Sequence, residues 1–299
     1  MSGYRIGVDI GGTNLRIGAA GADGALTHFR KLPRAQVLPG DTPCERLGTF
    51  LADCIAALGA VEAIGIGVPA TVSADRRTIL QAPNLPGLDG VALADALEAQ
   101  LGIPVRMERD VNLLLAHDMD AMQLPRAGLC AGIYFGTGIG NALMLDGRPY
   151  GGRSGVAGEL GHLPVIGGTA VCGCGNVGCT ECYASGRALE RIGAESFPDT
   201  PIAELFARHG DAPELVRFVD DMACVAAAEI NLLDPEATVI GGGVPSMAGF
   251  PYDRLMERIA ARLRKPLPAA NCAIYRSVDR PENGVLGGIR LAGVRIDCE

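Results

Sequence analysis

Two separate segments of the chain repeat one order of features: an apolar strand, a glycine- and threonine-containing turn, a second strand and an Asp-Gly turn. The first copy comprises residues 6–10, the turn Gly11-Gly12-Thr13-Asn14, residues 15–20 and Asp23-Gly24. The second comprises residues 131–135, the turn Gly136-Thr137-Gly138-Ile139-Gly140, residues 141–145 and Asp146-Gly147. Apolar runs interrupted by glycine turns are typical of paired strands. The repetition predicts a duplicated unit and a chain of two related halves.

Helical patterns alternate with further strands around these copies. Apolar residues at helical spacing predict helices over residues 43–58 and 93–101, and an apolar run predicts a strand over 63–68. A further short strand is expected over 105–108, after the helix stop at residues 102–104. A helical region over 184–233, a strand and turn over 237–243 and a last helix over 284–291 follow in the second half. This alternation indicates an α/β fold with a mainly parallel or mixed sheet.

The length of 299 residues is sufficient for two hydrophobic cores. We expect the last helix to return to the first half. We therefore place a small α/β domain at residues 1–112 plus 283–299 and a large α/β domain at residues 113–282.

Composition argues against several classes of partner. A net charge of −8 without a basic run disfavours nucleic acid, which is bound by clustered Lys and Arg. The first residues do not resemble a leader peptide, and no apolar run is long enough to span a bilayer. We expect a cytoplasmic protein with no membrane partner, whose ten cysteines do not form structural disulfides. The chain has no Trp and only 4% aromatic residues, so it offers few aromatic rings on which a carbohydrate could stack. Any sugar ligand would therefore be held mainly by hydrogen bonds.

The glycine turns are candidates for nucleotide binding. Glycine lets backbone N–H groups approach an anion, and threonine adds a hydroxyl donor. Neither turn is a Walker A loop, and a single turn of this kind most often serves strand reversal. Two copies favour binding of the β- and γ-phosphates of ATP, with Asp9 near Mg²⁺, whereas the turn after residue 240 is either an adenosine site or an ordinary tight turn. The nucleotide candidates are Asp9, Gly11, Gly12, Thr13, Asn14, Thr137, Gly138, Gly140, Gly241, Gly242 and Gly243.

A metal site is indicated by one histidine followed by three closely spaced cysteines. The residues are His162, Cys172, Cys174 and Cys179, with glycines between the cysteines. Three thiolates and one imidazole suit a closed tetrahedral Zn²⁺ site, which has a structural and not a catalytic role. Buried free cysteines are the alternative, and Cys182 is close enough in sequence to compete as a ligand.

Asp110 follows a short apolar strand and begins a helical run. In α/β folds, active sites gather at the carboxyl ends of strands, so its carboxylate is a candidate base for a sugar hydroxyl. The alternatives are a helix N-cap or an ion pair with Arg109.

Three further polar residues are candidate sugar ligands. Glu159 and Glu181 flank the cysteine loop, and carboxylates accept hydrogen bonds from sugar hydroxyls. Asn84 lies between two prolines, where its amide serves either a sugar or its own turn. Ordinary surface glutamates are the alternative for the first two.

Together these motifs resemble the ROK family of bacterial sugar kinases and repressors over nearly the whole chain. The resemblance implies a two-domain ribonuclease-H-like fold of the actin and hexokinase superfamily, with ATP and sugar in an interdomain cleft, and a homodimer. It further implies that Asp110 is the catalytic base, that Asn84, Glu159 and Glu181 bind sugar, and that His162 serves both zinc and sugar. Because the first glycine turn begins by residue 11, we expect this chain not to carry the helix-turn-helix domain that the family's repressors have.

Two departures from the family's glucokinases bear on the substrate. Arg109-Asp110 stands where those enzymes have Asn-Asp, and Pro69-Ala70 where they have Pro-Gly. The segments 82–86, 109–112 and 234–237 are more similar to bacterial D-allose kinases. A longer charged donor at Arg109 is expected to change which hydroxyl stereochemistry fits beside the base. The prediction is an ATP-dependent hexose kinase that forms D-allose 6-phosphate; a kinase for glucose, fructose or N-acetylmannosamine, or a sugar-sensing regulator without turnover, remains the alternative.

Overall fold

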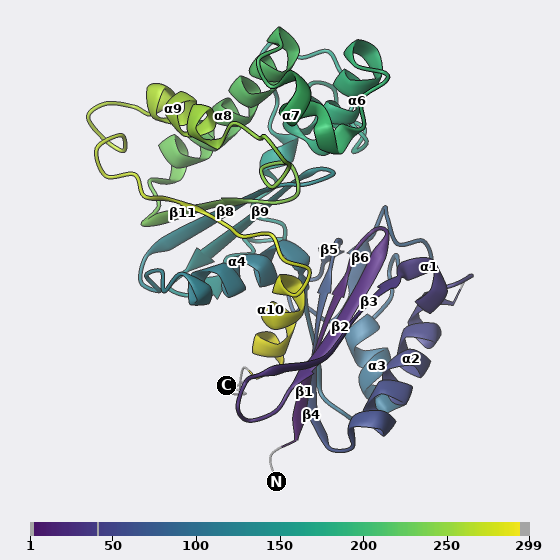
Figure 1. The fold of residues 1–299 in the computed structure, drawn as a ribbon. Coiled ribbons are helices and arrows are strands. Elements are labelled where there is room, and N and C mark those ends of the chain that lie inside the picture. Colours follow the sequence, from purple (N-terminus) through teal and green to yellow (C-terminus); the bar gives the residue numbers. More distant parts are fainter. Residues whose placement is uncertain (1–2, 41, 294–299) are drawn as a thin grey trace. The chain divides into compact units, whose positions relative to one another are not determined.

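The computed structural model describes residues 3–40 and 42–293. The chain folds into two compact units. Unit 1 comprises Met1–Gln123, Tyr150–Ala157 and Arg280–Glu299, and unit 2 comprises Leu124–Pro149 and Gly158–Asp279 (Figure 1). The domain limits expected from the sequence stay a prediction, and residues 1–2, 41 and 294–299 within them lie outside the described residues.

Unit 1 contains a five-stranded sheet in the order β3-β2-β1-β4-β7. β1 and β2, and likewise β2 and β3, are antiparallel, whereas β4 runs parallel to both β1 and β7. The strands are β1 (Tyr4–Ile10), β2 (Asn14–Ala20), β3 (Leu26–Pro33), β4 (Val61–Val68) and β7 (Val105–Arg109), with a small hairpin of β5 (Thr71–Val72) and β6 (Ile79–Gln81). The helices are α1 (Arg34–Val37), α2 (Pro43–Leu58), α3 (Leu93–Leu101), α4 (Asp110–Ala121) and α10 (Asn283–Ala292).

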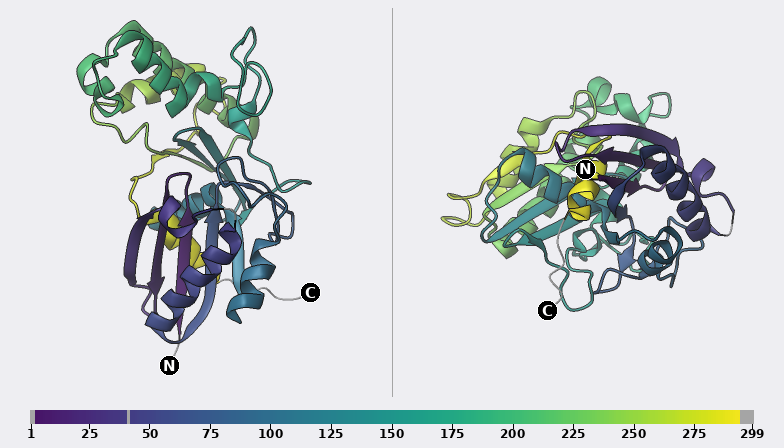
Figure 2. Two further views of the ribbon diagram at one scale, coloured as in Figure 1. Left: turned by 90° about the vertical axis from the view of Figure 1, so that its right-hand side faces the viewer. Right: turned by 90° about the horizontal axis from the view of Figure 1, so that it is seen from below.

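The two faces of this sheet are covered by different helices. Ile6 and Val8 of β1 belong to the core formed with α2 and α3, and the alternate positions of the strand face α10. A Cβ atom at Gly7 would lie 2.0 Å from the carbonyl oxygen of Val285, so only glycine lets α10 approach this closely. The C-terminal helix therefore packs directly on β1 and β4 (Figure 1, Figure 2).

Unit 2 contains a second five-stranded sheet in the order β10-β9-β8-β11-β12. Its strands are β8 (Leu129–Phe135), β9 (Ile139–Leu145), β10 (Arg148–Pro149), β11 (Ala237–Gly241) and β12 (Ile274–Arg276). Its helices are η1 (Leu160–His162), α5 (Glu181–Ala184), α6 (Gly186–Ser196), η2 (Ile202–Glu204), α7 (Leu205–His209), α8 (Pro213–Leu233) and α9 (Tyr252–Arg262). A core centred on α8 packs against the sheet through Ile133 and Ile240.

The predicted duplication is confirmed by the topology. In both sheets three successive strands form an antiparallel meander, and two later strands extend the sheet in parallel from its first strand. The helices expected over 43–58 and 93–101 have those bounds. The helical region expected over 184–233 is divided into several helices; Pro201 stands immediately before η2, and Pro213 is the first residue of α8. Within the described part of the chain, no helix combines the length and the apolar character that a membrane span requires.

Candidate functional site

The first glycine turn joins β1 to β2 and is closed by its own backbone. The N–H of Gly11 donates to the carbonyl of Asn14 at 2.8 Å. Arg34 Nε donates to the carbonyl of Gly12 at 2.7 Å, which ties the turn to α1. Gly12 and Thr13 remain exposed. The turn thus presents accessible backbone beside a cationic side chain, an arrangement suited to an anion.

Asp9 precedes this turn and is largely buried. Its Oδ2 accepts a hydrogen bond from Arg16 Nη1 at 2.8 Å. A Cβ atom at Gly284 would lie 2.7 Å from Asp9 Cγ, so the carboxyl group is next to the first turn of α10. Burial raises the pKa of Asp9, and the positive charge of Arg16 opposes that rise. Arg16 Nε is buried without a hydrogen-bond partner in the described part of the chain, so one polar group beside Asp9 is left unsatisfied.

Asp110 is the first residue of α4, immediately after β7. Its Oδ1 accepts a hydrogen bond from the N–H of Val111 at 2.9 Å. A side-chain N-cap instead accepts from a residue two or three positions ahead, so this contact does not have the geometry of a cap. Burial of the carboxyl group, together with the negative charge of Asp9, raises the pKa of Asp110 to about 7. A carboxyl group that titrates near neutrality is suited to general-base work.

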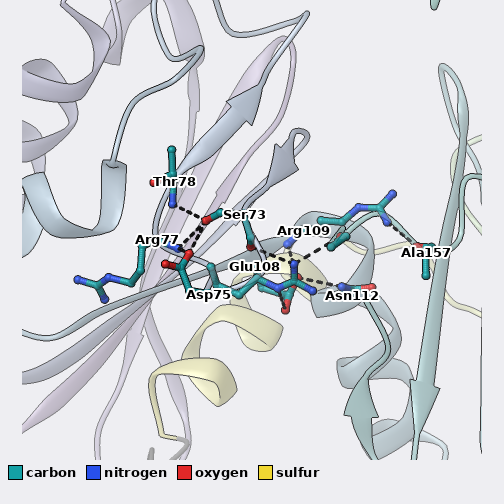
Figure 3. A network of polar contacts seen from close by, with 10 residues as sticks. Ser73, Asp75, Arg77, Thr78, Glu108, Arg109, Asn112 and Ala157 are labelled. Atoms are coloured by element: carbon teal, nitrogen blue, oxygen red, sulfur yellow. Dashed lines mark hydrogen bonds and ion pairs between the residues drawn. The ribbon is translucent and has the colours of Figure 1, made fainter. Parts of the chain in front are cut away.

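A buried glutamate, Glu108, organises the junction between β7 and α4 (Figure 3). Its Oε1 accepts hydrogen bonds from the N–H of Arg109 and from Asn112 Nδ2, both at 2.9 Å. Its Oε2 forms an ion pair with Arg76 Nε at 3.0 Å. Sequence reasoning missed Glu108 and Arg76, and only the position of an acidic residue two places before Asp110 could have indicated the first.

Arg109, predicted to help select the sugar, points toward the backbone of residue 157. Its Nη1 donates to the carbonyl of Ala157 at 2.9 Å (Figure 3). Asn84 is exposed in a turn closed by the N–H of Leu85 and the carbonyl of Ala82. Both residues lie in unit 1, as does Asp110.

In unit 2, the predicted zinc ligands converge. The ligand atoms of His162, Cys172, Cys174 and Cys179 all lie within 4.8 Å of one another. His162 Nδ1 is 3.6 Å from Cys172 Sγ, and the sulfur atoms of Cys174 and Cys179 are 3.7 Å apart. A tetrahedron with ordinary Zn–N and Zn–S bond lengths has edges of about 3.6 Å between N and S and about 3.8 Å between two S atoms. The four side chains therefore fit Zn²⁺, and Cys182 is not part of the group found among the described residues.

The two flanking glutamates are placed differently. Glu159 Oε2 is 3.8 Å from His162 Nε2, so the ring nitrogen that faces away from the sulfur atoms faces this exposed carboxylate. Glu181 begins α5, and its Oε2 accepts from the N–H of Ile139 at 3.0 Å. A Cβ atom at Gly138 would lie 2.3 Å from that oxygen. Glu181 is thus in direct contact with the second glycine turn.

The second glycine turn, and the turn Gly241-Gly242-Gly243 after β11, are also held by contacts with residues outside the turns. The carbonyl of Gly136 accepts from the N–H of Gly186 at 2.7 Å, at the start of α6, and that of Thr137 accepts from Arg187. After β11, Gly242 has φ +99°, and a Cβ atom there would lie 2.5 Å from the carbonyl oxygen of Phe135. Gly243 is exposed with open space where a side chain would be, so a flat ligand could lie against its backbone.

A buried pair in unit 2 escaped the sequence reasoning. Asn141 Nδ2 donates to Glu229 Oε1 at 2.6 Å and to the carbonyl of Gly132 at 2.9 Å. Glu229 is 3% exposed, and its Oε2 has no hydrogen-bond partner in the described part of the chain. Burial raises the pKa of Glu229 to about 8, and the hydrogen bond from Asn141 opposes that rise.

Because of Glu229, the free energy of unfolding of the protein is therefore expected to decrease as the pH rises. The unfolded chain releases this proton near pH 4.3 and the folded chain only near pH 8, so stability falls between these values by about 1.4 kcal/mol per pH unit from this group. Glu229→Gln removes this contribution. Denaturant unfolding at pH 5 and pH 8 should show the variant gaining stability relative to the wild type at the higher pH. The exposed Glu257→Gln in α9 is the control, and equal pH dependence of all three proteins would contradict the assignment.

The duplicated sheets with their glycine turns define a protein of the hexokinase-like α/β class. A model of the ROK family matches residues 5–294, and the chain belongs to this family. N-acetyl-D-glucosamine kinase of Erwinia tasmaniensis is 35% identical over 311 residues, covering 96% of this chain and 97% of the relative. The kinase of the same name from Pectobacterium carotovorum subsp. carotovorum is 32% identical over 308 residues, with the same coverage.

A solved structure extends the comparison to the fold. The ROK family glucokinase from Streptomyces griseus, crystallised with glucose and AMPPNP, is 28% identical with a TM-score of 0.79, covering 97% of this chain and 99% of that chain. The predicted hexokinase-like α/β fold and family are thereby confirmed.

Proposed function

We infer that the protein is an ATP-dependent hexose kinase, and we propose that it transfers the γ-phosphoryl group of ATP to the 6-OH of the sugar. The observation that carries the mechanism is Asp110: a carboxyl group at the carboxyl end of a sheet strand, with a pKa raised to about 7. The kinase names of relatives that match nearly the whole chain support the activity.

In the proposed reaction, Asp110 accepts the proton of the sugar hydroxyl while that oxygen forms a bond to the γ-phosphorus. The bond between this phosphorus and the oxygen bridging to the β-phosphate breaks, and ADP leaves. Positioning contributes most of the rate acceleration in such transfers. A base that is half ionised near pH 7 takes up the proton without a large energetic penalty.

For the nucleotide, we propose that the phosphates lie against Gly11, Gly12, Thr13 and Asn14 of the first turn and Thr137, Gly138 and Gly140 of the second. Gly241, Gly242 and Gly243 would accommodate the adenosine. Asp9 would supply an oxygen ligand of the kind that Mg²⁺ prefers, and the unsatisfied Arg16 Nε beside it suits a phosphate oxygen. When bound, Mg²⁺ would neutralise charge on the β- and γ-phosphates.

For the sugar, we propose that Asn84 and Arg109 donate hydrogen bonds to its oxygen atoms, that Glu159 and Glu181 accept hydrogen bonds from its hydroxyl groups, and that His162 also binds it. His162 would bind Zn²⁺ through Nδ1, because that nitrogen is the one near Cys172, which leaves Nε2 and Glu159 on the other side of the ring. The zinc would act structurally by ordering the loop that carries these groups.

Two sugars are the leading candidates. N-acetyl-D-glucosamine is favoured by the names of the relatives at 35% and 32% identity. D-Allose is favoured by Arg109 beside the base, since a longer cationic donor alters which hydroxyl orientation fits. A homodimer, implied by the family resemblance, remains a prediction.

A panel of hexoses tests the proposal. ADP release from ATP is followed with N-acetyl-D-glucosamine, D-allose, D-glucose, D-fructose and N-acetyl-D-mannosamine, each compared by kcat/KM. We expect sugar-dependent turnover, with at least about tenfold preference for one of the first two, because a hydrogen-bonded site rejects analogues that leave its polar groups unpaired. Binding of a sugar by calorimetry without ADP release would instead indicate a sugar sensor and would refute the kinase assignment.

A further inference from the structure

Arg76 has a backbone conformation that does not suit its residue type. It lies in the connection between β5 and β6, where its N–H donates to the carbonyl of Ser73 at 2.9 Å, and its φ is +60°. This left-handed region is strained for residues with a Cβ atom and unstrained for glycine. Strain of this kind persists where the side chain has a role that the surrounding structure supports.

The guanidinium group of Arg76 links two segments far apart in sequence. Nε forms the ion pair with Glu108, and Nη1 donates to the carbonyl of Gly155 at 3.4 Å. A Cβ atom at Gly151 would lie 2.7 Å from Nη2, so a glycine there leaves room for the guanidinium group. The side chains of Arg76 and Glu108 are only 19% and 6% exposed, so this pair is weakly screened by solvent.

The same two segments are linked a second time by Arg109. Its Nη1 binds the carbonyl of Ala157, two residues beyond Gly155, while its own N–H donates to Glu108 (Figure 3). Glu108 therefore connects both arginines, and both arginines bind carbonyl oxygens of the segment Tyr150–Ala157. We call these three residues, Arg76, Glu108 and Arg109, the carbonyl clamp.

The carbonyl clamp lies next to two parts of the proposed sugar site in sequence. Through Glu108 it fixes the junction at which Asp110 begins α4. Through Gly155 and Ala157 it fixes the segment that leads directly into Gly158 and Glu159.

We propose that Arg76 and Glu108 are positioning residues that orient the groups proposed to bind and deprotonate the sugar. They act through Asp110 and the segment Tyr150–Ala157 and do not contact the reacting atoms. This inference rests on the proposed function. Loss of the carbonyl clamp should lower kcat/KM for the sugar and leave the KM for ATP nearly unchanged. The reason is that the glycine turns proposed for the nucleotide are held by other contacts.

Arg76→Gly is the most informative variant, because glycine removes the side chain and also relieves the strained φ. We expect kcat/KM for the sugar to fall roughly 10- to 100-fold, the range of one or two hydrogen bonds to charged groups, with the KM for ATP within about twofold of the wild type. Loss of the buried ion pair should lower the temperature of unfolding, and relief of the strained φ should offset part of that decrease. Arg76→Lys keeps the positive charge but not the several guanidinium donors, so its kcat/KM for the sugar should lie between those of Arg76→Gly and the wild type.

Arg77→Ala is the matched control. Arg77 is the next residue and also joins an ion pair, with Glu98 and Asp95, and donates to the carbonyl of Val105. These partners of the Arg77 side chain lie outside the carbonyl clamp, so its loss should affect stability and not sugar kinetics.

Sugar affinity, measured by calorimetry on the same proteins, distinguishes failure of the clamp proposal from failure of the kinase assignment. Normal sugar affinity and normal kcat/KM in Arg76→Gly would overturn the clamp while leaving the kinase assignment intact. An equal loss in Arg77→Ala would also overturn it, by showing a general effect of destabilisation. A wild-type protein without sugar-dependent turnover would refute the proposed function itself, and the inference with it.

Discussion

Replacing Asp110 by Asn is expected to reduce kcat by a factor on the order of 10² to 10⁴, because the amide cannot accept the proton of the sugar hydroxyl. Asn keeps the size of the side chain and an oxygen that can accept from the N–H of Val111, so the fold should be retained. Sugar affinity should stay within roughly tenfold, because Asn can still form a hydrogen bond with the sugar, and a neutral hydrogen bond is weaker than a charged one by only about 1 kcal/mol. Steady-state ADP release and thermal melting on one preparation measure these quantities.

The pH profile gives a second readout for Asp110. The base must be ionised, and the pKa of Asp110 is raised to about 7, so wild-type activity should decline as the pH falls through 7. This decline of activity at low pH should be absent in Asp110→Asn. Asp120→Asn, near the other end of α4, is the control and should keep both the wild-type rate and the decline at low pH. A near-normal kcat in Asp110→Asn would remove this residue from the mechanism.

Loss of the metal is expected to have the largest effect on stability. The purified protein should contain about one equivalent of zinc per chain, and Cys179→Ser, which removes a buried ligand, should abolish it. Since binding to the folded site alone stabilises the fold, chelation should lower the temperature of unfolding. It should also weaken sugar affinity, because Glu159 and Glu181 flank the ordered loop. Metal analysis, thermal melting and calorimetry measure the three effects.

Cys182→Ser provides the control for this experiment. Cys182 is near the ligands in sequence but is not part of the convergent group among the described residues, so its replacement should leave the zinc content unchanged. Less than about half an equivalent of zinc in carefully prepared wild-type protein would refute the metal site.

Features that depend on local sequence were predicted well. The convergent group of His162 and three cysteines was recognisable because the cysteines lie within eight consecutive residues, Cys172 to Cys179, with glycines that allow a tight loop. The duplicated sheet was recognisable because each copy repeats strand, turn and strand within about twenty residues. The limits of α2 were marked by a proline in its first turn and by Gly59 after its last residue.

Features that depend on distant contacts were not predicted. Glu108 meets Arg76 across 32 positions of sequence, and Asn141 meets Glu229 across 88. Nothing in the helical pattern of α8 distinguishes a buried glutamate from an exposed one, because the partner that satisfies it is on a strand of another part of the chain. The left-handed φ of Arg76 had no signal at all, since glycine, Asn or Asp would be expected there.

The central claim is that this chain transfers phosphate from ATP to a hexose. The most direct measurement is the quantity of hexose 6-phosphate and ADP formed in one reaction, determined by phosphorus NMR with the sugar selected from the panel. The claim predicts equal amounts of the two products, with Asp110→Asn forming both at least about a hundredfold more slowly. ADP formed without any phosphorylated sugar, or sugar binding without either product, would contradict it.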